Sequence, residues 1–292
     1  MQLSSQPRPL AAAPAAEIVS IQVIRRDGSA APLNIGKIRT VVDWACRDLA
    51  ANALELEASL KTRLRPGITT REIQDNLISC ALELCSPEAP DWRYVAGRLH
   101  IWSLWKDIRV QRGYQYGGYG RTVQAKVLEG EYDSRLSLYS AAELEEANRW
   151  INPDWDADYD YAGAVLLTQR YLLPNELPQE AFLTCALLLA SGEAPEERLV
   201  QARRFYEAIA RRKISLATPI LANLRIPGGS LASCFITAMD DNLESIFDGI
   251  QDAARISKNG GGVGVDLSRI RATGSWVMGK PNASGGVVPW VK

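Results

Sequence analysis

The chain has 292 residues, of which 47% are hydrophobic and 23% are charged, which is typical of a globular protein large enough for two domains. Thirty-three basic residues balance 34 acidic ones, and this formal net charge of −1 argues against a general nucleic-acid binder, which would carry a basic excess. A single nucleotide remains a suitable ligand, because one such site needs only a few local cations. No apolar run approaches the length of a membrane span, so no transmembrane segment is predicted.

The cysteines and the single histidine limit the chemistry that the chain can perform. The five cysteines are Cys46, Cys80, Cys85, Cys185 and Cys234. They form no C-x-x-C pair and no regular framework, so neither structural zinc nor a disulfide scaffold is expected, and we expect a reducing, cytoplasmic compartment. Because His100 is the single histidine, a multi-histidine metal site is excluded, and a Ser-His-Asp triad is not expected. Within its helical pattern we interpret it as a helix-face residue without nearby partners.

The first part of the chain predicts a tail followed by a small α+β domain. Residues 1–17 are rich in Ala and Pro and lack the apolar core of a signal peptide, so we expect a disordered tail. Residues 18–107 then predict a β-hairpin and four helices. In chain order, we expect a strand over 20–25, a short return over 31–34, and helices that begin after Asn34, near Leu54, after Thr69 or Thr70, and at Pro90-Asp91.

A change of composition divides the remainder of the chain. Residues 108–122 are rich in Gly and Tyr and are interpreted as a linker. A helical domain is expected over 123–212, with helical patterns at 139–150, 157–172, 177–190 and 195–212. Residues 213–292 predict the first elements of an α/β core that is incomplete in this chain. The signals are short apolar runs, a helix over about 242–258 and a buried strand in VGVDLSRI.

The segment IQVIRRDGSAAPLNIGKI combines a strand that ends in two arginines with a helix that starts at a capping Asn and carries an early Lys. The free N–H groups of a helix N-terminus, together with these cations, suit a triphosphate. The alternative is a charged hairpin that is merely solvated surface.

The amino-acid sequence of this segment resembles that of the ATP-cone, a domain that senses ATP and dATP. The resemblance rests on VIRRDGS followed by LNIGKI, then GITTREIQDNLI and APDWRYVAGRLHIW. It implies that ATP or dATP, with Mg²⁺ on the nucleotide, binds as an allosteric effector. The residues implied to contact it are Val23, Arg25, Arg26, Asn34, Lys37, Thr70 and Lys106. The family pattern often has an acid and a histidine where this chain has Ala31 and Gln74.

Cys234 and the glycine cluster NGGGVG are weak signals by themselves. A cysteine in an apolar strand is most often a small buried hydrophobe. The glycine cluster lacks the G-K-[ST] ending of a P-loop and follows a helix rather than a strand, so its default interpretation is a tight or flexible turn.

Five motifs in order change that interpretation. KISLATPI, SLASCF, DNLESIF, KNGGGVG and SRIRATGS resemble the start of the ten-stranded α/β catalytic barrel of ribonucleotide reductases. With the ATP-cone, they favour the class I large (alpha) subunit, which reduces ribonucleoside diphosphates to deoxyribonucleotides. A fragment of the class II, cobalamin-dependent enzyme is the nearest alternative.

The resemblance implies roles for several residues near Cys234. In the family, a thiyl radical removes the 3′-hydrogen of the ribose, and a cysteine pair then supplies reducing equivalents and closes to a disulfide. Cys234 would be one member of that pair. Thr218 and Ser233 would hydrogen-bond the substrate, and the backbone of Gly261 and Gly262 would approach it closely.

A second effector site is implied by Asp241, Asn242 and Leu243 together with Arg271. In the family, a deoxynucleotide bound at the equivalent segment selects the base to be reduced. An acid there accepts hydrogen bonds from a deoxyribose hydroxyl, and an arginine pairs with phosphate. The alternative is that Asp241 or Asn242 simply caps the following helix.

By resemblance, the radical cysteine, its Asn and Glu neighbours and the second cysteine of the reducing pair lie beyond the equivalent of Lys292. We therefore expect the chain to be inactive alone, as part of a split enzyme, a processed or truncated fragment, or an intein half. The implied partners are a second polypeptide that completes the barrel, a small (beta) subunit whose metal supplies the radical, further large subunits, and thioredoxin or glutaredoxin. We expect no metal bound by this chain, no nucleic acid and no membrane. The alternative is a regulatory ATP/dATP sensor without catalysis.

Overall fold

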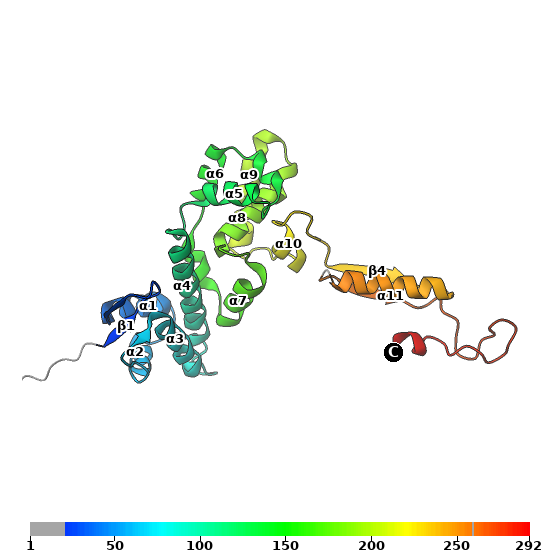
Figure 1. Ribbon diagram of the computed structural model, residues 1–292, viewed down its shortest axis with the longest axis horizontal. Helices are drawn as coiled ribbons and strands as arrows, with labels where there is room; N and C mark the ends of the chain where they lie inside the picture. Colours follow the sequence, from blue (N-terminus) through cyan, green and yellow to red (C-terminus); the bar gives the residue numbers. More distant parts are fainter. Residues whose placement is uncertain (1–20, 259) are drawn as a thin grey trace, which may run out of the picture. The chain divides into compact units, whose positions relative to one another are not determined.

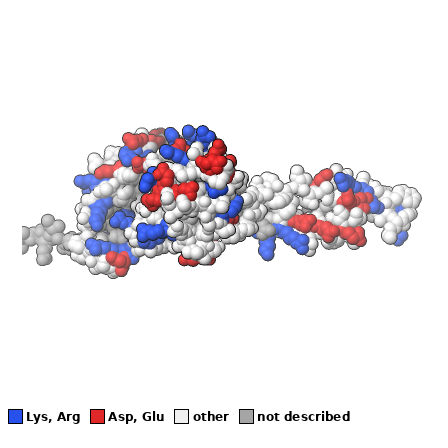
Figure 2. All heavy atoms as spheres, turned by 90° about the horizontal axis from the view of Figure 1, so that it is seen from above, with Lys and Arg blue, Asp and Glu red and all other residues white. Residues whose placement is uncertain are grey.

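The computed structural model describes residues 21–258 and 260–292, and the chain divides after Trp92 into two compact units (Figure 1). The expected tail over 1–17 lies outside the described residues. Lys and Arg are interspersed with Asp and Glu on the face shown in Figure 2, in keeping with the near-zero net charge. Within the described ranges, no helix has the length and apolar character needed to cross a membrane.

The first unit is built on a three-stranded sheet with the order β2-β1-β3. Strands β1 (Gln22–Ile24) and β2 (Ala30–Pro32) form the expected hairpin, with Gly28 at φ +83° in its turn. The sequence analysis missed β3 (Ile68–Thr69), which pairs in parallel with β1. Two residues are too few to show a periodic pattern.

Three helices complete the first unit: α1 (Ile35–Cys46), α2 (Ala53–Lys61) and α3 (Thr70–Leu84). The expected cap of α1 is confirmed, because the Asn34 side chain accepts a hydrogen bond from the Lys37 N–H at 3.0 Å. Thr69 rather than Thr70 caps α3, in a reciprocal capping box with Glu72. The hydrogen bond from Thr69 also lowers the pKa of the Glu72 carboxyl. Local side-chain chemistry therefore fixes where these helices begin.

The linker expected over 108–122 is wrong. Helix α4 (Trp92–Arg112) continues past residue 107, and α5 (Tyr119–Leu128) begins at Tyr119, so only residues 113–118 connect them. Tyr119 is buried, and its hydroxyl hydrogen-bonds that of Thr184 at 2.9 Å. A Gly- and Tyr-rich composition was interpreted as a solvated connection, whereas some of its tyrosines pack into the core.

The helical region of the second unit packs around α8 (Pro178–Leu189), which is buried on almost every side. Its other helical elements are η1 (Ser134–Leu138), α6 (Ala141–Asn148), η2 (Pro153–Asp158), α7 (Tyr161–Leu166), the π-helical turn η3 (Leu167–Tyr171), η4 (Ala190–Gly192), α9 (Pro195–Ala210) and α10 (Thr218–Asn223). Part of the apolar run KISLATPIL, expected to open an α/β core, is thus helical.

The last part of the chain is a parallel β-α-β unit. Strands β4 (Cys234–Ala238) and β5 (Gly262–Asp266) pair in register, joined by α11 (Leu243–Lys258), which lies alongside them (Figure 1). A short helix α12 (Val288–Val291) follows. The expectation of a buried strand is wrong for β5, most of which is exposed, because its sheet has two strands.

The expected α+β domain and helical region are confirmed, and the segment expected to begin an α/β barrel is a parallel β-α-β unit. The residues described contain two small sheets and many helices but no closed barrel. Apart from those of the linker, the exact domain limits expected from the sequence stay a prediction.

Candidate functional sites

In the first unit, several expected nucleotide contacts lie at one end of the sheet. Arg25 follows β1, and Thr70 follows β3, whose Thr69 pairs with Ile24. The parallel pairing therefore brings the arginine turn and the start of α3 to the same sheet edge. Arg26 is half-buried in this turn.

The other expected contacts in this unit differ in how available they are. Lys37 and Asn34 are exposed, but the Asn34 side chain already caps α1. Val23 is buried in β1. The two positions that depart from the family pattern, Ala31 and Gln74, are both buried.

Lys106 belongs to the second unit, on α4. Its ammonium nitrogen lies 5.5 Å from the centroid of the Trp102 ring. The placement of Lys106 toward a nucleotide on the first unit stays a prediction.

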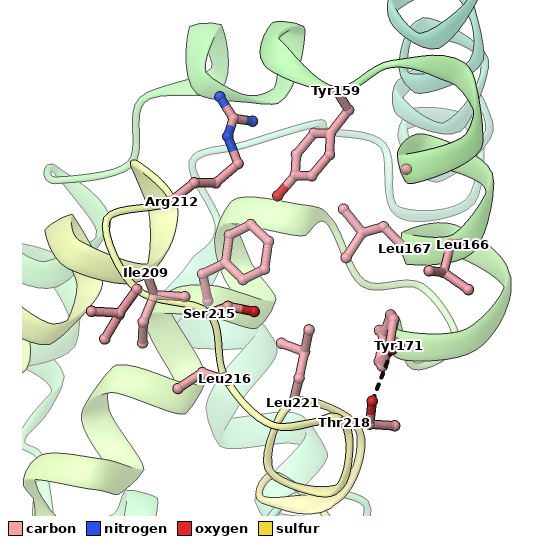
Figure 3. Close-up of a pocket in the computed structure, with 13 residues that line it drawn as sticks. Tyr159, Leu166, Leu167, Tyr171, Ile209, Arg212, Ser215, Leu216, Thr218 and Leu221 are labelled. Carbon is pink, nitrogen blue, oxygen red and sulfur yellow. Dashed lines mark hydrogen bonds between the residues drawn. The ribbon is translucent and has the colours of Figure 1, made fainter.

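A pocket of about 400 Å³ lies in the helical region and contains Thr218 (Figure 3). Apolar side chains from η3, α8, α9 and α10 form most of its wall, including Leu167, Phe182 and Leu221. Its polar groups include Tyr159, Tyr171, Arg212, Ser215 and Thr218. The hydroxyls of Thr218 and Tyr171 face one another at 3.1 Å.

A buried ion pair is hydrogen-bonded to the backbone of Tyr171, one of the residues that line this pocket. The Arg225 Nε lies 3.0 Å from Glu176 Oε1, and both side chains are completely inaccessible. Arg225 also donates to the carbonyl of Tyr171 at 2.6 Å, and Tyr132 donates to Glu176 at 2.7 Å. Burial, reinforced by the Glu176 charge, raises the pKa of Tyr132 well above its ordinary value. Sequence reasoning missed this cluster; its one signal is the polar run ELPQE at the start of a strongly apolar helix.

A second buried cluster surrounds Asp156. Its carboxylate accepts hydrogen bonds from Trp105 Nε1 at 3.0 Å, Tyr116 OH at 2.5 Å and Gln179 Nε2 at 2.8 Å. Burial raises the pKa of Asp156 to about 6 despite these three donors. The cluster fixes the connection between α4 and α5 against α8, which is a structural role.

Cys234 opens β4 and stands opposite Gly262 in the parallel register. Cys234 and Ser233 are exposed, whereas Cys46, Cys80 and Cys185 are buried and Cys85 is half-buried. Burial raises the pKa of the Cys185 thiol to about 11, which keeps it protonated and unreactive. Cys234 is thus the one exposed cysteine among the five.

The two glycines beside Cys234 have different reasons to be glycine. A Cβ on Gly261 would lie 2.8 Å from Ile256 Cγ2 and 2.9 Å from Phe235 Cε2, so packing alone requires glycine there. A Cβ on Gly262 would meet only the Ser233 carbonyl, at 3.4 Å. The Gly262 N–H donates to that carbonyl at 2.7 Å, and the Gly261 N–H donates to Ile256 O at 3.0 Å.

Asp241 and Arg271 lie together beyond the ends of β4 and β5. The Arg271 Nε is 2.5 Å from Asp241 Oδ2, and a second guanidinium nitrogen donates to the Trp276 carbonyl at 3.1 Å. Of the two residues expected to cap α11, Asn242 is the one that does so, because its side chain accepts a hydrogen bond from the Ser245 N–H at 2.8 Å. Leu243 is exposed at the first position of α11.

His100 is not isolated, contrary to our expectation. Its Nε2 lies 2.8 Å from the Thr168 hydroxyl, and its ring meets Tyr161 edge-on with centroids 5.9 Å apart. Both partners lie more than 60 residues along the chain, so no local pattern announced them. Within the described ranges, no three acidic, cysteine or histidine side chains gather as a metal site would require.

Three family models match the chain in order. They are the ATP cone domain over residues 21–107, the all-alpha domain of ribonucleotide reductase over 157–229 and the ribonucleotide reductase barrel domain over 232–292.

The similar curated proteins are ribonucleoside-diphosphate reductase alpha subunits. The one from Synechocystis is 79% identical over 93% of this chain and 36% of its own length. That of Helicobacter pylori is 36% identical over 93% of the chain and 35% of its own length. That of Escherichia coli is 32% identical over 94% of the chain and 37% of its own length. The chain thus spans about a third of the length of these relatives.

Proposed function

The chain belongs to the family of class I ribonucleotide reductase large (alpha) subunits and corresponds to their N-terminal part, and on this premise we propose that it serves in the reduction of ribonucleoside diphosphates under nucleotide control. Its ATP-cone indicates binding of a nucleotide effector.

The exposed thiol of Cys234, opposite the glycine backbone of β5, carries the proposal. Cys234 and a second cysteine outside this chain reduce the ribose together. The two thiols lose two hydrogen atoms and close to a disulfide; one hydrogen replaces the 2′-hydroxyl at carbon, and the other leaves with that hydroxyl as water. A thiol suits this step because its sulfur readily gives up hydrogen and then pairs with a second sulfur.

Thr218 and Ser233 supply hydroxyl groups that hydrogen-bond the substrate. The backbone N–H groups of Gly261 and Gly262 are both occupied by carbonyl acceptors. Their contribution is therefore close approach without side chains rather than hydrogen-bond donation. Gly262 suits this role best, because packing does not itself demand glycine there.

Two sets of residues bind effectors. At the specificity site, Asp241, Asn242, Leu243 and Arg271 receive a deoxynucleotide, whose phosphate competes with Asp241 for the Arg271 guanidinium. In the ATP-cone, ATP or dATP with its Mg²⁺ contacts Val23, Arg25, Arg26, Asn34, Lys37, Thr70 and Lys106. The parallel pairing of β1 and β3 supports this assignment for Arg25 and Thr70.

The partners follow from the family. The remaining part of an alpha subunit, on the same or a second polypeptide, supplies the radical cysteine and completes the barrel. A small beta subunit with a metal centre generates the radical, large subunits associate with one another, and thioredoxin or glutaredoxin reduces the disulfide. These processes take place in the cytoplasm.

The test is reconstitution of this chain with the remaining part of the alpha subunit and the beta subunit. The expected result is conversion of cytidine diphosphate to its deoxy form, dependent on the beta subunit and inhibited or stimulated by dATP and ATP. Binding of dATP to this chain without any reduction would instead indicate a regulatory sensor. Reduction that requires adenosylcobalamin in place of the beta subunit would indicate the class II enzyme.

A further inference from the structure

The pocket in the helical region is lined by Tyr171, whose hydroxyl lies beside that of Thr218. We propose that Tyr171 is a positioning residue, whose phenol orients the hydroxyl of Thr218 toward the substrate. This inference rests on the proposed function, because it takes Thr218 to be a substrate contact.

The local backbone brings Tyr171 to this place. It ends the π-helical turn η3, in which the Leu172 N–H donates to the Leu167 carbonyl at 3.1 Å. Such turns are rare and often occur at functional sites. Here the turn presents the phenol to Thr218 at the start of α10, with the two oxygens 3.1 Å apart (Figure 3).

The direction of this hydrogen bond determines its use. A phenol is more acidic than an aliphatic hydroxyl, so Tyr171 is the natural donor and Thr218 the acceptor. The Thr218 hydroxyl then keeps its own hydrogen for another acceptor, such as a phosphate or ribose oxygen. Thr218 is exposed, so without Tyr171 its hydroxyl would rotate freely among water partners.

A buried group links the two backbone segments that carry these residues. Arg225 follows α10, the helix that begins at Thr218, and donates to the carbonyl of Tyr171 at 2.6 Å. Arg225 is itself held by the ion pair with Glu176 at 3.0 Å. One inaccessible guanidinium thus ties the end of η3 to the segment that carries Thr218, which is the arrangement expected of a preorganised binding group.

The experiment measures steady-state kinetics for a ribonucleoside diphosphate in the reconstituted reductase with Thr218→Ala, Tyr171→Phe and both changes together. Tyr139→Phe is the matched control, since it also removes one phenol hydroxyl, which donates to the Leu187 carbonyl at 2.7 Å. We expect Tyr171→Phe to raise KM roughly three- to tenfold, the range for one hydrogen bond, with a smaller change in kcat. The double variant should be no worse than Thr218→Ala alone, and the control should retain the KM of the unchanged enzyme.

The outcomes separate the inference from the proposed function. If Thr218→Ala leaves KM unchanged, the proposed substrate contact fails and the inference fails with it. If Thr218→Ala raises KM while Tyr171→Phe does not, only the inference is overturned. Independent, multiplying effects of the two changes, or an equal rise in KM for Tyr139→Phe, would also overturn it. Thermal unfolding of each variant identifies any fall in the apparent kcat that comes from loss of folded protein.

Discussion

The helical region between Tyr119 and Ile226 and the β4-α11-β5 unit use the same kinds of interaction in opposite surroundings. The Arg225–Glu176 pair in the helical region is completely inaccessible, whereas the side chains of the Arg269–Asp240 pair in the β-α-β unit are 62% and 57% exposed. The first pair is sealed by a large apolar core, and the second stands in water.

Apolar packing differs in the same way. The buried core of the β-α-β unit consists of Met239, Ile246 and Ile270, while Ile236 is 88% exposed and Met278 is 97% exposed. The difference teaches that the Arg225–Glu176 pair lies in surroundings that this chain completes, whereas Cys234 has a defined backbone position in β4 but an exposed side chain.

The largest effect is expected for Arg225→Met in the helical region. It leaves the Glu176 carboxylate buried without its partner, and breaking a buried pair in this way destabilises by about 3–5 kcal/mol. Denaturant unfolding of the chain measures the loss. Adding Glu176→Gln should recover part of it, and a single variant as stable as the unchanged chain would contradict the sealed environment.

A pH-dependent effect is expected from Asp156. Burial raises its pKa from 3.8 to about 6, so between these values the native carboxyl keeps a proton that the unfolded chain has released. Rising pH therefore favours unfolding across this window, by up to about 3 kcal/mol. Unfolding midpoints at pH 4 and pH 6 measure the slope. Asp156→Asn should flatten it, whereas Asp158→Asn, at an exposed carboxyl, should leave it unchanged.

A smaller effect is expected for Gly261→Ala in the β-α-β unit. The new methyl group would overlap Ile256 and Phe235, and overpacking of this kind typically costs about 1–3 kcal/mol. Gly262→Ala is the matched control, with an ordinary contact to one carbonyl. Equal stability of the two variants, by thermal unfolding, would show that α11 does not pack on β4 and β5 as described. Lost activity in Gly262→Ala without lost stability would support its substrate role.

The smallest effect is expected for Arg269→Ala. Its pair with Asp240 is exposed, so water and salt replace the interaction and the unfolding midpoint should not change measurably. Set beside Arg225→Met, this variant isolates the contribution of burial. A large destabilisation by Arg269→Ala would show that the β-α-β unit is more enclosed than its exposed side chains indicate.

The sequence predicted the features that depend on neighbouring residues. Asn34 and Asn242 cap helices through side chains that accept hydrogen bonds from backbone N–H groups three residues along the chain. The strand that carries Cys234 was predicted from its short apolar run. Features that depend on residues far apart in the sequence were not predicted. Arg225 and Glu176 are 49 positions apart, and nothing local to either one indicates the other.

Two further misses have physical reasons. Tyr116 lies in a segment whose composition suggested a linker, but the Asp156 carboxylate requires its hydroxyl as a donor in the core. The π-helical turn that ends at Tyr171 has no periodic signature, because one widened turn leaves too few residues to reveal a period. The partner residue of Thr218 therefore became visible only in three dimensions.

The measurement that bears most directly on the proposed function is the activity of the reconstituted reductase with Cys234→Ser, beside Cys85→Ser as the matched control. Serine cannot close a disulfide, so Cys234→Ser should reduce deoxyribonucleotide formation to the background of the assay, while Cys85→Ser, on a half-buried thiol in the first unit, should keep full activity. Sustained turnover by the Cys234→Ser enzyme would contradict the catalytic role given to this chain.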